Sequence, residues 1–208
     1  MRALLLVLFI TFSLCGHAQI QKGSTLLGGS LNFNSGNKKG TGFGISGQYG
    51  KAYKENTFRG FQLGYNHSDQ TGSIANVYFG GIFYRRYVPV IKQFYFFGEV
   101  NLNAGYSNSK LTPGFSGPSA VNTQIISYYG SLSLIPGLSY AVNSKLHLEI
   151  VFLSLANLYY AHNENKNTSG GITISDRENS FGLNTSTQLN LLSNVQFGFR
   201  FLLQKKKR

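Results

Sequence analysis

The chain of 208 residues has a single cysteine, no tryptophan, four prolines and few charges. Cys15 lies inside the N-terminal apolar segment, so the chain that follows this segment can form no disulfide, thiol nucleophile or thiolate metal site. Charged residues make up 12% of the sequence, whereas soluble domains have roughly 25%. This shortage argues against a soluble enzyme, which covers its surface with lysine and glutamate. Abundant aromatic and β-branched residues exclude a disordered chain.

The N-terminus has the pattern of a secretory signal peptide. Met1 and Arg2 precede an apolar run from Ala3 to Leu14, and small residues flank His17 at positions 16 and 18. We therefore predict that residues 1–18 are a signal peptide and that Gln19 begins the mature chain. A membrane anchor would need about 20 apolar residues, and a lipoprotein at Cys15 would need a smaller residue than Leu14. Both alternatives are less consistent with the sequence than export and cleavage.

After residue 24, apolar and polar residues alternate with the period of a β-strand. No segment has helical periodicity, and no apolar run is as long as a membrane helix. Pro136 removes one ladder donor, so we expect a bulge or kink there. The pattern predicts eight strands but leaves open a count of ten. The expected strands cover about 25–34, 41–50, 58–67, 75–88, 94–107, 124–142, 146–160 and 194–203.

The polar face of these strands indicates where the protein resides. It is composed mainly of Gly, Ser, Asn and Gln, which fit a narrow lumen, while the other face carries the large apolar residues expected to contact lipid. The connections 51–56, 89–93 and 143–145 are short, and the connections 107–123 and 161–178 on the opposite side are long. We expect an all-β fold, an eight-stranded antiparallel up-and-down transmembrane β-barrel over residues 19–203. A soluble secreted β-domain is the alternative.

The last strand carries the most specific family signal. A polar residue, a glycine, an aromatic residue and a terminal hydrophobic residue follow one another at the spacing of an outer-membrane assembly signal. These residues are Gln196, Gly198, Phe201 and Leu203. With the segments 28–31, 97–99 and 136–140, they make residues 24–203 resemble the small outer-membrane β-barrels of Gram-negative bacteria, the OmpA/OmpX-like family. The resemblance implies location in the cell outer membrane and insertion by the barrel-assembly machinery.

The chain departs from this family at its C-terminus. Such chains commonly stop at the terminal aromatic residue, but this one continues to Arg208. We interpret residues 204–208 as a basic periplasmic tail.

Four ionisable residues occupy the polar face. A turn centred on Lys92 would place Arg85 opposite Glu99, and Arg86 would then point outward. Because an unpaired buried charge costs several kcal/mol, we expect an interior network of salt bridges that fills the barrel, with a functional gate as the alternative. The network is predicted to contain Arg85, Glu99, Glu149 and Arg200.

The net charge of +12 suggests contact with anionic groups. Cations in the outer connections could bind lipopolysaccharide phosphates or other polyanions, and we expect outer-membrane lipid and lipopolysaccharide as partners. Nucleic acid is excluded because no recognition motif accompanies the charge. We expect a monomer. The outer cations are Lys38, Lys39, Lys110, Lys166 and Arg177.

Catalytic signals are weak. His67, Ser68 and Asp69 are consecutive, and neighbours on one strand point to opposite faces, so they form no triad. A dyad of His67 or His162 with Asp69 remains an alternative. We expect no enzyme, no cofactor and no metal site. The sequence predicts a structural or surface scaffold whose loops bind cell-surface ligands, with a narrow pore or small-ligand transporter, or a lipid- or peptide-modifying enzyme, as the alternatives.

Overall fold

The computed structural model describes residues 20–36, 40–70, 72–111, 121–152, 154–185 and 196–203. The expected signal peptide and the basic tail lie outside these ranges. No helix within them is both long and apolar enough to cross a bilayer. The strands are β1 (Thr25–Gly36), β2 (Gly40–Lys54), β3 (Thr57–Gln70), β4 (Ser73–Ile91), β5 (Phe94–Leu111), β6 (Asn122–Ala141), β7 (Leu146–Val151), β8 (Ala156–Ser169), β9 (Ile172–Thr185) and β10 (Gln196–Leu203).

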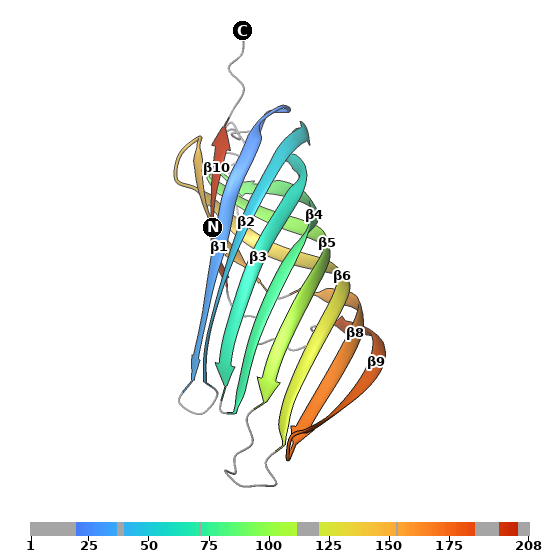
Figure 1. Ribbon diagram of the computed structural model, residues 1–208. Helices are drawn as coiled ribbons and strands as arrows, with labels where there is room; N and C mark the ends of the chain where they lie inside the picture. The colour runs from blue at the N-terminus through green and yellow to red at the C-terminus, as the bar shows by residue number, and fades with distance from the viewer. Residues whose placement is uncertain are drawn as a thin grey trace, which may run out of the picture.

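Eight of these strands form a closed ring. Strands β1 to β6 pair in chain order, and the ring then continues from β6 to β7, from β7 to β10 and from β10 back to β1. All these pairings are antiparallel. The strands tilt around a common axis, and both chain ends of the ring lie at the same end of the barrel (Figure 1). The expected eight-stranded antiparallel barrel is therefore confirmed. Closure matters because an unpaired strand edge is very costly in hydrocarbon.

The seventh expected strand, 146–160, is not continuous. It divides into β7 and β8, which pair with different parts of β6. Gly137 pairs with Val151 and Leu134 with Ala156, so three steps along β6 correspond to five along its partner. The Phe152 amide donates to the Pro136 carbonyl at 3.0 Å, and the Leu155 amide donates to the Leu134 carbonyl at 2.8 Å. Because Pro136 has no N–H, the irregularity arises in the strand beside it, while β6 itself continues.

The connection expected over 161–178 is also different. It is a β-hairpin formed by the rest of β8 and by β9, which pair from Ala156–Thr185 to Ser169–Ile172. Its turn is Gly170-Gly171, with φ of 56° and 82°, which is the left-handed geometry of a two-residue hairpin. Our interpretation as a loop followed from the Asn- and Thr-rich composition. The Gly-Gly turn was the available signal for a hairpin.

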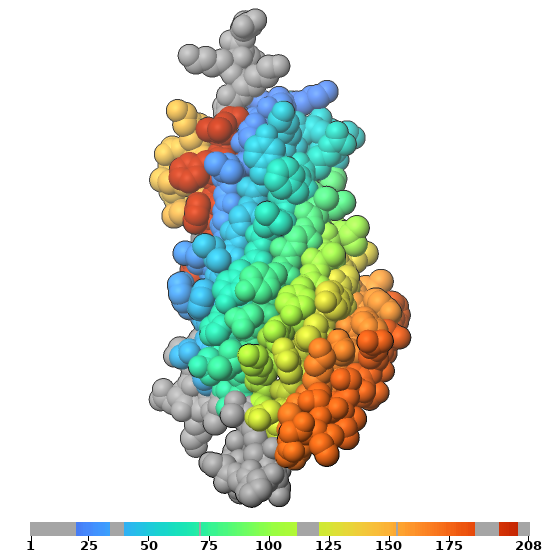
Figure 2. Space-filling model, in the orientation of Figure 1, coloured from blue at the N-terminus to red at the C-terminus, as the bar shows by residue number. Residues whose placement is uncertain are grey.

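The barrel has two ends with different connections. The turn end carries the connections 55–56, 92–93 and 142–145, and the hairpin end carries the connections 37–39, 71–72, 112–121 and 170–171, of which only 112–121 is long. At the hairpin end, β8 and β9 extend sideways from the ring (Figure 1), and the same pair forms the orange projection of Figure 2.

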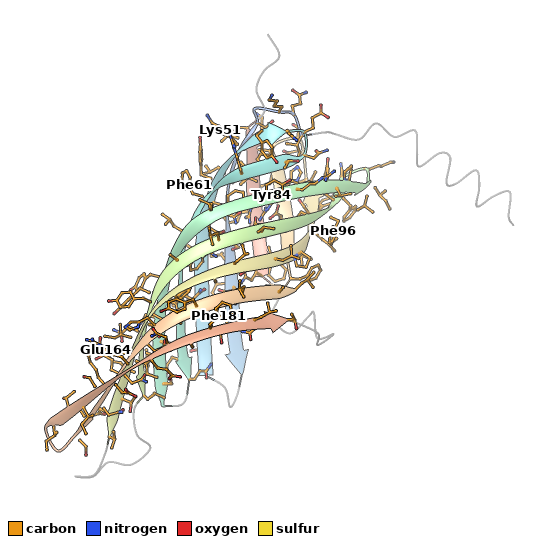
Figure 3. The ribbon with its side chains drawn as sticks, turned by 90° about the vertical axis from the view of Figure 1, so that its right-hand side faces the viewer. Lys51, Phe61, Tyr84, Phe96, Glu164 and Phe181 are labelled. Carbon is orange, nitrogen blue, oxygen red and sulfur yellow. The ribbon has the colours of Figure 1, made fainter. Side chains whose placement is uncertain are left out.

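The outer wall is covered by large apolar side chains. Phe33, Leu63, Phe181 and Phe197 are 76%, 67%, 73% and 66% exposed, and side chains of this kind project from the strands all along the face seen in Figure 3. Exposed apolar surface on this scale is incompatible with water and suits lipid contact. The structure thus places the apolar stripe of the alternating pattern on the outside.

Aromatic rings form a row across the outer wall toward the hairpin end. Tyr65, Tyr78, Tyr106 and Tyr128 are register partners on four consecutive strands. Their ring centroids are 4.9, 6.5 and 5.4 Å apart along the row. Rows of this kind mark the level at which a barrel crosses from acyl chains to headgroups.

The interior is less uniformly polar than the sequence suggested. The turn end holds a hydrophobic cluster that includes Phe58, Phe83, Tyr95, Phe97 and Leu202. Lumen-facing glycines leave room for these and other interior rings: a Cβ on Gly137 would collide with the Phe97 ring, and one on Gly64 with the Phe79 ring. The predicted lumen of mainly small neutral residues and four charges therefore lacked this cluster, in which aromatic residues fill the turn end.

Candidate functional site

The four predicted interior charges gather in the turn-end half of the lumen. Arg85 lies on β4, Glu99 on β5, Glu149 on β7 and Arg200 on β10. Each side chain points inward, and the residues are 1%, 3%, 2% and 2% exposed. Two positive and two negative groups therefore share a volume shielded from water.

Arg85 is the centre of this cluster. Its register partner is Glu99, and the two side chains form an ion pair of 2.5 Å. Across the lumen, its guanidinium donates to both oxygens of Glu149, at 3.0 and 2.8 Å. The same group lies 4.4 Å from the centre of the Phe97 ring, close enough for a cation–π interaction.

Arg200 completes the arrangement from the last strand. Its guanidinium is 3.3 Å from Glu149 and also donates to the carbonyls of Gly29 and Phe199, at 2.5 and 2.9 Å. A side chain on Gly28 would collide with the Arg200 side chain, so this glycine provides the space that the arginine occupies. Glu149 is thus shared by Arg200 of the neighbouring strand β10 and Arg85 of β4 across the lumen.

Sequence reasoning missed the neutral members of the cluster. The Tyr87 hydroxyl donates to Glu149 at 2.6 Å and accepts from Arg85 at 3.1 Å. Gln48 accepts from Arg85 at 3.2 Å and donates to Glu99 at 3.1 Å and to Gln62 at 2.7 Å. Tyr87 is two residues from Arg85 on β4 and so shares its face. This two-residue spacing could have predicted that Tyr87 joins the cluster. It was not used because apolar residues occupy both faces of this strand in the sequence.

These contacts close the lumen at one end. Paired charges, amides and the hydrophobic cluster occupy the same cross-section, and the Gln62 amide continues the network to Asn103 at 2.8 Å. An eight-stranded barrel is just wide enough for side chains to fill. Chemically, the arrangement fixes the strands to one another.

The other half of the lumen is different. A cavity of about 310 Å³ lies among neutral polar and aromatic side chains of β6, β8 and β9. Its lining residues carry no formal charge. They are Ser127, Tyr129, Ser131, Asn157, Tyr159, Ala161, Asn163 and Asn184.

The candidate catalytic histidines lie in hydrogen-bonded pairs with asparagines. His67 Nδ1 is 2.9 Å from Asn76 Oδ1 on β4, and His162 Nδ1 is 2.8 Å from Asn179 Oδ1 on β9. Asp69 is the register partner of Thr41 and Ile74 and makes no described hydrogen bond to either histidine. Within the described ranges, no three His, Cys, Asp or Glu side chains gather as a metal ion requires. The structure therefore brings no dyad together here.

The predicted outer cations do not form one patch. Lys110 is exposed on β5, whereas Lys166 and Arg177 lie 3.7 and 3.9 Å from Glu164 on the β8–β9 hairpin. Lys38 and Lys39 lie outside the described residues. The 156–185 hairpin contains Glu164, Asp176 and Glu178 against those two cations, a net charge of 2 − 3 = −1.

The residues of the assembly signal all lie on β10. Gly198 faces the lumen, while Phe201 and Leu203 are 43% and 54% exposed on the outer wall. Gln196 begins the strand and pairs with Val151. The structure describes their positions in the folded barrel, and their role in insertion stays a prediction.

Together, the ring, the lipid-compatible wall and the filled interior define an eight-stranded membrane β-barrel. The structure is similar to neisserial surface protein A (NspA), with 13% identity, a TM-score of 0.42, and coverage of 88% of this chain and 96% of that one. It is also similar to the translocator domain of the autotransporter NalP from Neisseria meningitidis, with 10% identity, a TM-score of 0.38, and coverage of 97% and 92%. No protein-family model matches the chain, and no curated protein sequence matches it.

Proposed function

We propose that this protein is a non-conducting scaffold of the outer membrane, which spans the bilayer and presents its hairpin end at the cell surface. The Arg85–Glu149 contact carries the proposal, because it joins opposite walls of the barrel and places paired charges across the lumen. A hydrated ion could pass only if this pairing broke, and breaking a buried pair costs about 3–5 kcal/mol.

Two features support the orientation. An exported chain enters the outer membrane from the periplasm, and barrels of this kind have short periplasmic turns and longer external connections. The long connection 112–121 and the extended β8–β9 hairpin both lie at the end opposite the turns 55–56, 92–93 and 142–145. In this orientation the exposed strands of the hairpin face the exterior of the cell.

The hairpin is the part best suited to contact with other molecules. Ile172 and Ile174 are 70% and 67% exposed near its turn. The net charge of the hairpin is −1, which does not favour polyanion binding by simple attraction. Among the predicted outer cations that the structure describes, only Lys110 is exposed without an ion pair. We therefore infer that display of this hairpin, rather than capture of polyanions, is its main surface role.

Single-channel recording tests the closed lumen. The mature chain is refolded and inserted into planar bilayers, with insertion checked independently by heat-dependent mobility on gels. We expect no stable conductance steps. A variant with Arg85, Glu99 and Glu149 all replaced by serine removes the central pairs and, where it folds, should conduct. Stable steps from the unmodified protein would contradict the scaffold proposal and favour the narrow-pore alternative.

A further inference from the structure

The outer wall near the turn end has a basic cluster with an adjoining apolar groove. Lys51 on β2 and Tyr84 on β4 are the two register partners of Arg59 on β3. Arg86 follows Tyr84 on the same face of β4 and is exposed. Apart from the lumen-facing Arg85, the segments 51–59 and 84–92 contain five Lys or Arg residues and one acid, Glu55 in the turn. This surface therefore carries a strong excess of positive charge.

Tyrosine rings organise the cations at this level. The Arg59 guanidinium lies 5.4 Å from the centre of the Tyr53 ring, and the rings of Tyr53 and Tyr84 are 6.1 Å apart. Amphipathic tyrosines sit at the height of lipid headgroups, and Figure 3 shows Lys51 near the turn end with Tyr84 on the neighbouring part of the wall. The Arg59 guanidinium is thus held at the height of these tyrosine rings, the level expected for lipid phosphates.

The groove begins at Arg59 and runs toward the middle of the barrel. It has a volume of about 440 Å³, and its walls are Ile82, Tyr84, Val100 and Leu102, with Arg59 at one side. Tyr84 pairs with Val100, and Ile82 pairs with Leu102 one row further from the turn end. The Phe83 side chain is buried, 3% exposed, so the backbone of β4 forms the floor between these rows. An acyl chain has the shape and polarity to fill such a groove.

We propose that this surface is a specific binding site for an anionic phospholipid of the periplasmic leaflet. Arg59 and Arg86 bind the phosphate, the Tyr53 and Tyr84 rings flank the headgroup, and one acyl chain lies against Ile82, Val100 and Leu102. The inference rests on the proposed membrane insertion and orientation. Charge complementarity selects the anionic lipid, since each basic residue near a membrane surface contributes about 1 kcal/mol of attraction to anionic lipid.

Lipid retention measured by native mass spectrometry tests the site. The full mature chain is inserted into vesicles of mixed phosphatidylglycerol and phosphatidylcholine, transferred to mild detergent, and analysed for bound lipid. We expect phosphatidylglycerol to be retained about tenfold over phosphatidylcholine. The double variant R59Q/R86Q should lose this preference. The control K110Q/R177Q removes two exposed charges from the hairpin end and should keep it.

A second pair of variants tests the groove. Val100→Trp fills it and should reduce retention of phosphatidylglycerol, whereas Leu148→Trp, at a 50% exposed position on β7, should not. Three results would each overturn the inference. The unmodified protein could retain the two lipids equally, R59Q/R86Q and K110Q/R177Q could lose the preference for phosphatidylglycerol equally, or Val100→Trp could retain phosphatidylglycerol in full. Vesicle flotation separates this failure from that of the proposed function, because a protein that does not float with vesicles is not inserted at all.

Discussion

Glu149 and Arg85 lie 64 positions apart in the chain, yet their side chains meet at 2.8 Å inside the turn-end half of the barrel. Glu149 also accepts a hydrogen bond from Tyr87 and lies 3.3 Å from Arg200. One carboxylate on β7 therefore contacts the neighbouring strand β10 and, across the lumen, β4.

Replacing Glu149 by glutamine should strongly destabilise the barrel. The change leaves Arg85 paired with Glu99 but removes the charged partner of Arg200, which is 2% exposed. Removing one member of a buried pair costs about 3–5 kcal/mol. Urea unfolding in lipid vesicles, followed by far-ultraviolet circular dichroism, measures the free energy of unfolding. Glu164→Gln is the matched control and should cost less than about 1 kcal/mol, because its ion pairs are partly exposed.

Tyr87→Phe removes one hydroxyl and its two hydrogen bonds while leaving the ring in place. We expect a loss of about 1–3 kcal/mol, since the bonds are to charged groups. Tyr49→Phe, on the outer wall, should change stability little. The same unfolding assay compares the two, and equal stabilities would show that the Tyr87 hydroxyl contributes nothing to the cluster.

Two glycines on opposite faces of the wall should tolerate alanine differently. A Cβ on Gly64 meets the Phe79 ring inside the lumen, whereas a Cβ on Gly47 meets nothing within 4 Å. Gly64→Ala should cost about 1–3 kcal/mol through overpacking, and Gly47→Ala should stay within about 0.5 kcal/mol. The difference in unfolding midpoint measures the effect. A larger cost at Gly47 would contradict the assignment of the faces.

Shortening the β8–β9 hairpin should leave the barrel intact. Glu164 and Arg177 are register partners, so residues 165–176 can be replaced by Gly-Gly to form a two-residue turn. The removed residues touch no member of the charge cluster among the contacts described, and we expect the free energy of unfolding to change by less than about 1 kcal/mol. Loss of heat-resistant mobility on gels would show instead that the hairpin is needed for folding.

Much of the fold was predictable because strand alternation is a local property. Side chains along a strand change face at every residue, so the apolar stripe through Phe61 and Leu63 identified the lipid-facing wall. A turn centred on Lys92 predicted the Arg85–Glu99 pairing, but in the structure the turn pairs Ile91 with Phe94. An irregularity between Pro89 and Ile91 then shifts the register so that Arg85 lies opposite Glu99. The β8–β9 hairpin was not predicted because its Asn- and Thr-rich composition is typical of a loop, although Gly170-Gly171 is a typical hairpin turn.

The sequence by itself determined most of the strands and their two faces, because these depend on residues close together in the chain. Only the tertiary structure decided that Glu149 contacts Arg85, Arg200 and Tyr87 together, and that the rings of Phe58 and Phe97 fill the lumen beside them. These contacts depend on closure of the ring between β1 and β10. Closure sets which side chains face one another across the barrel, and no local periodicity contains that information.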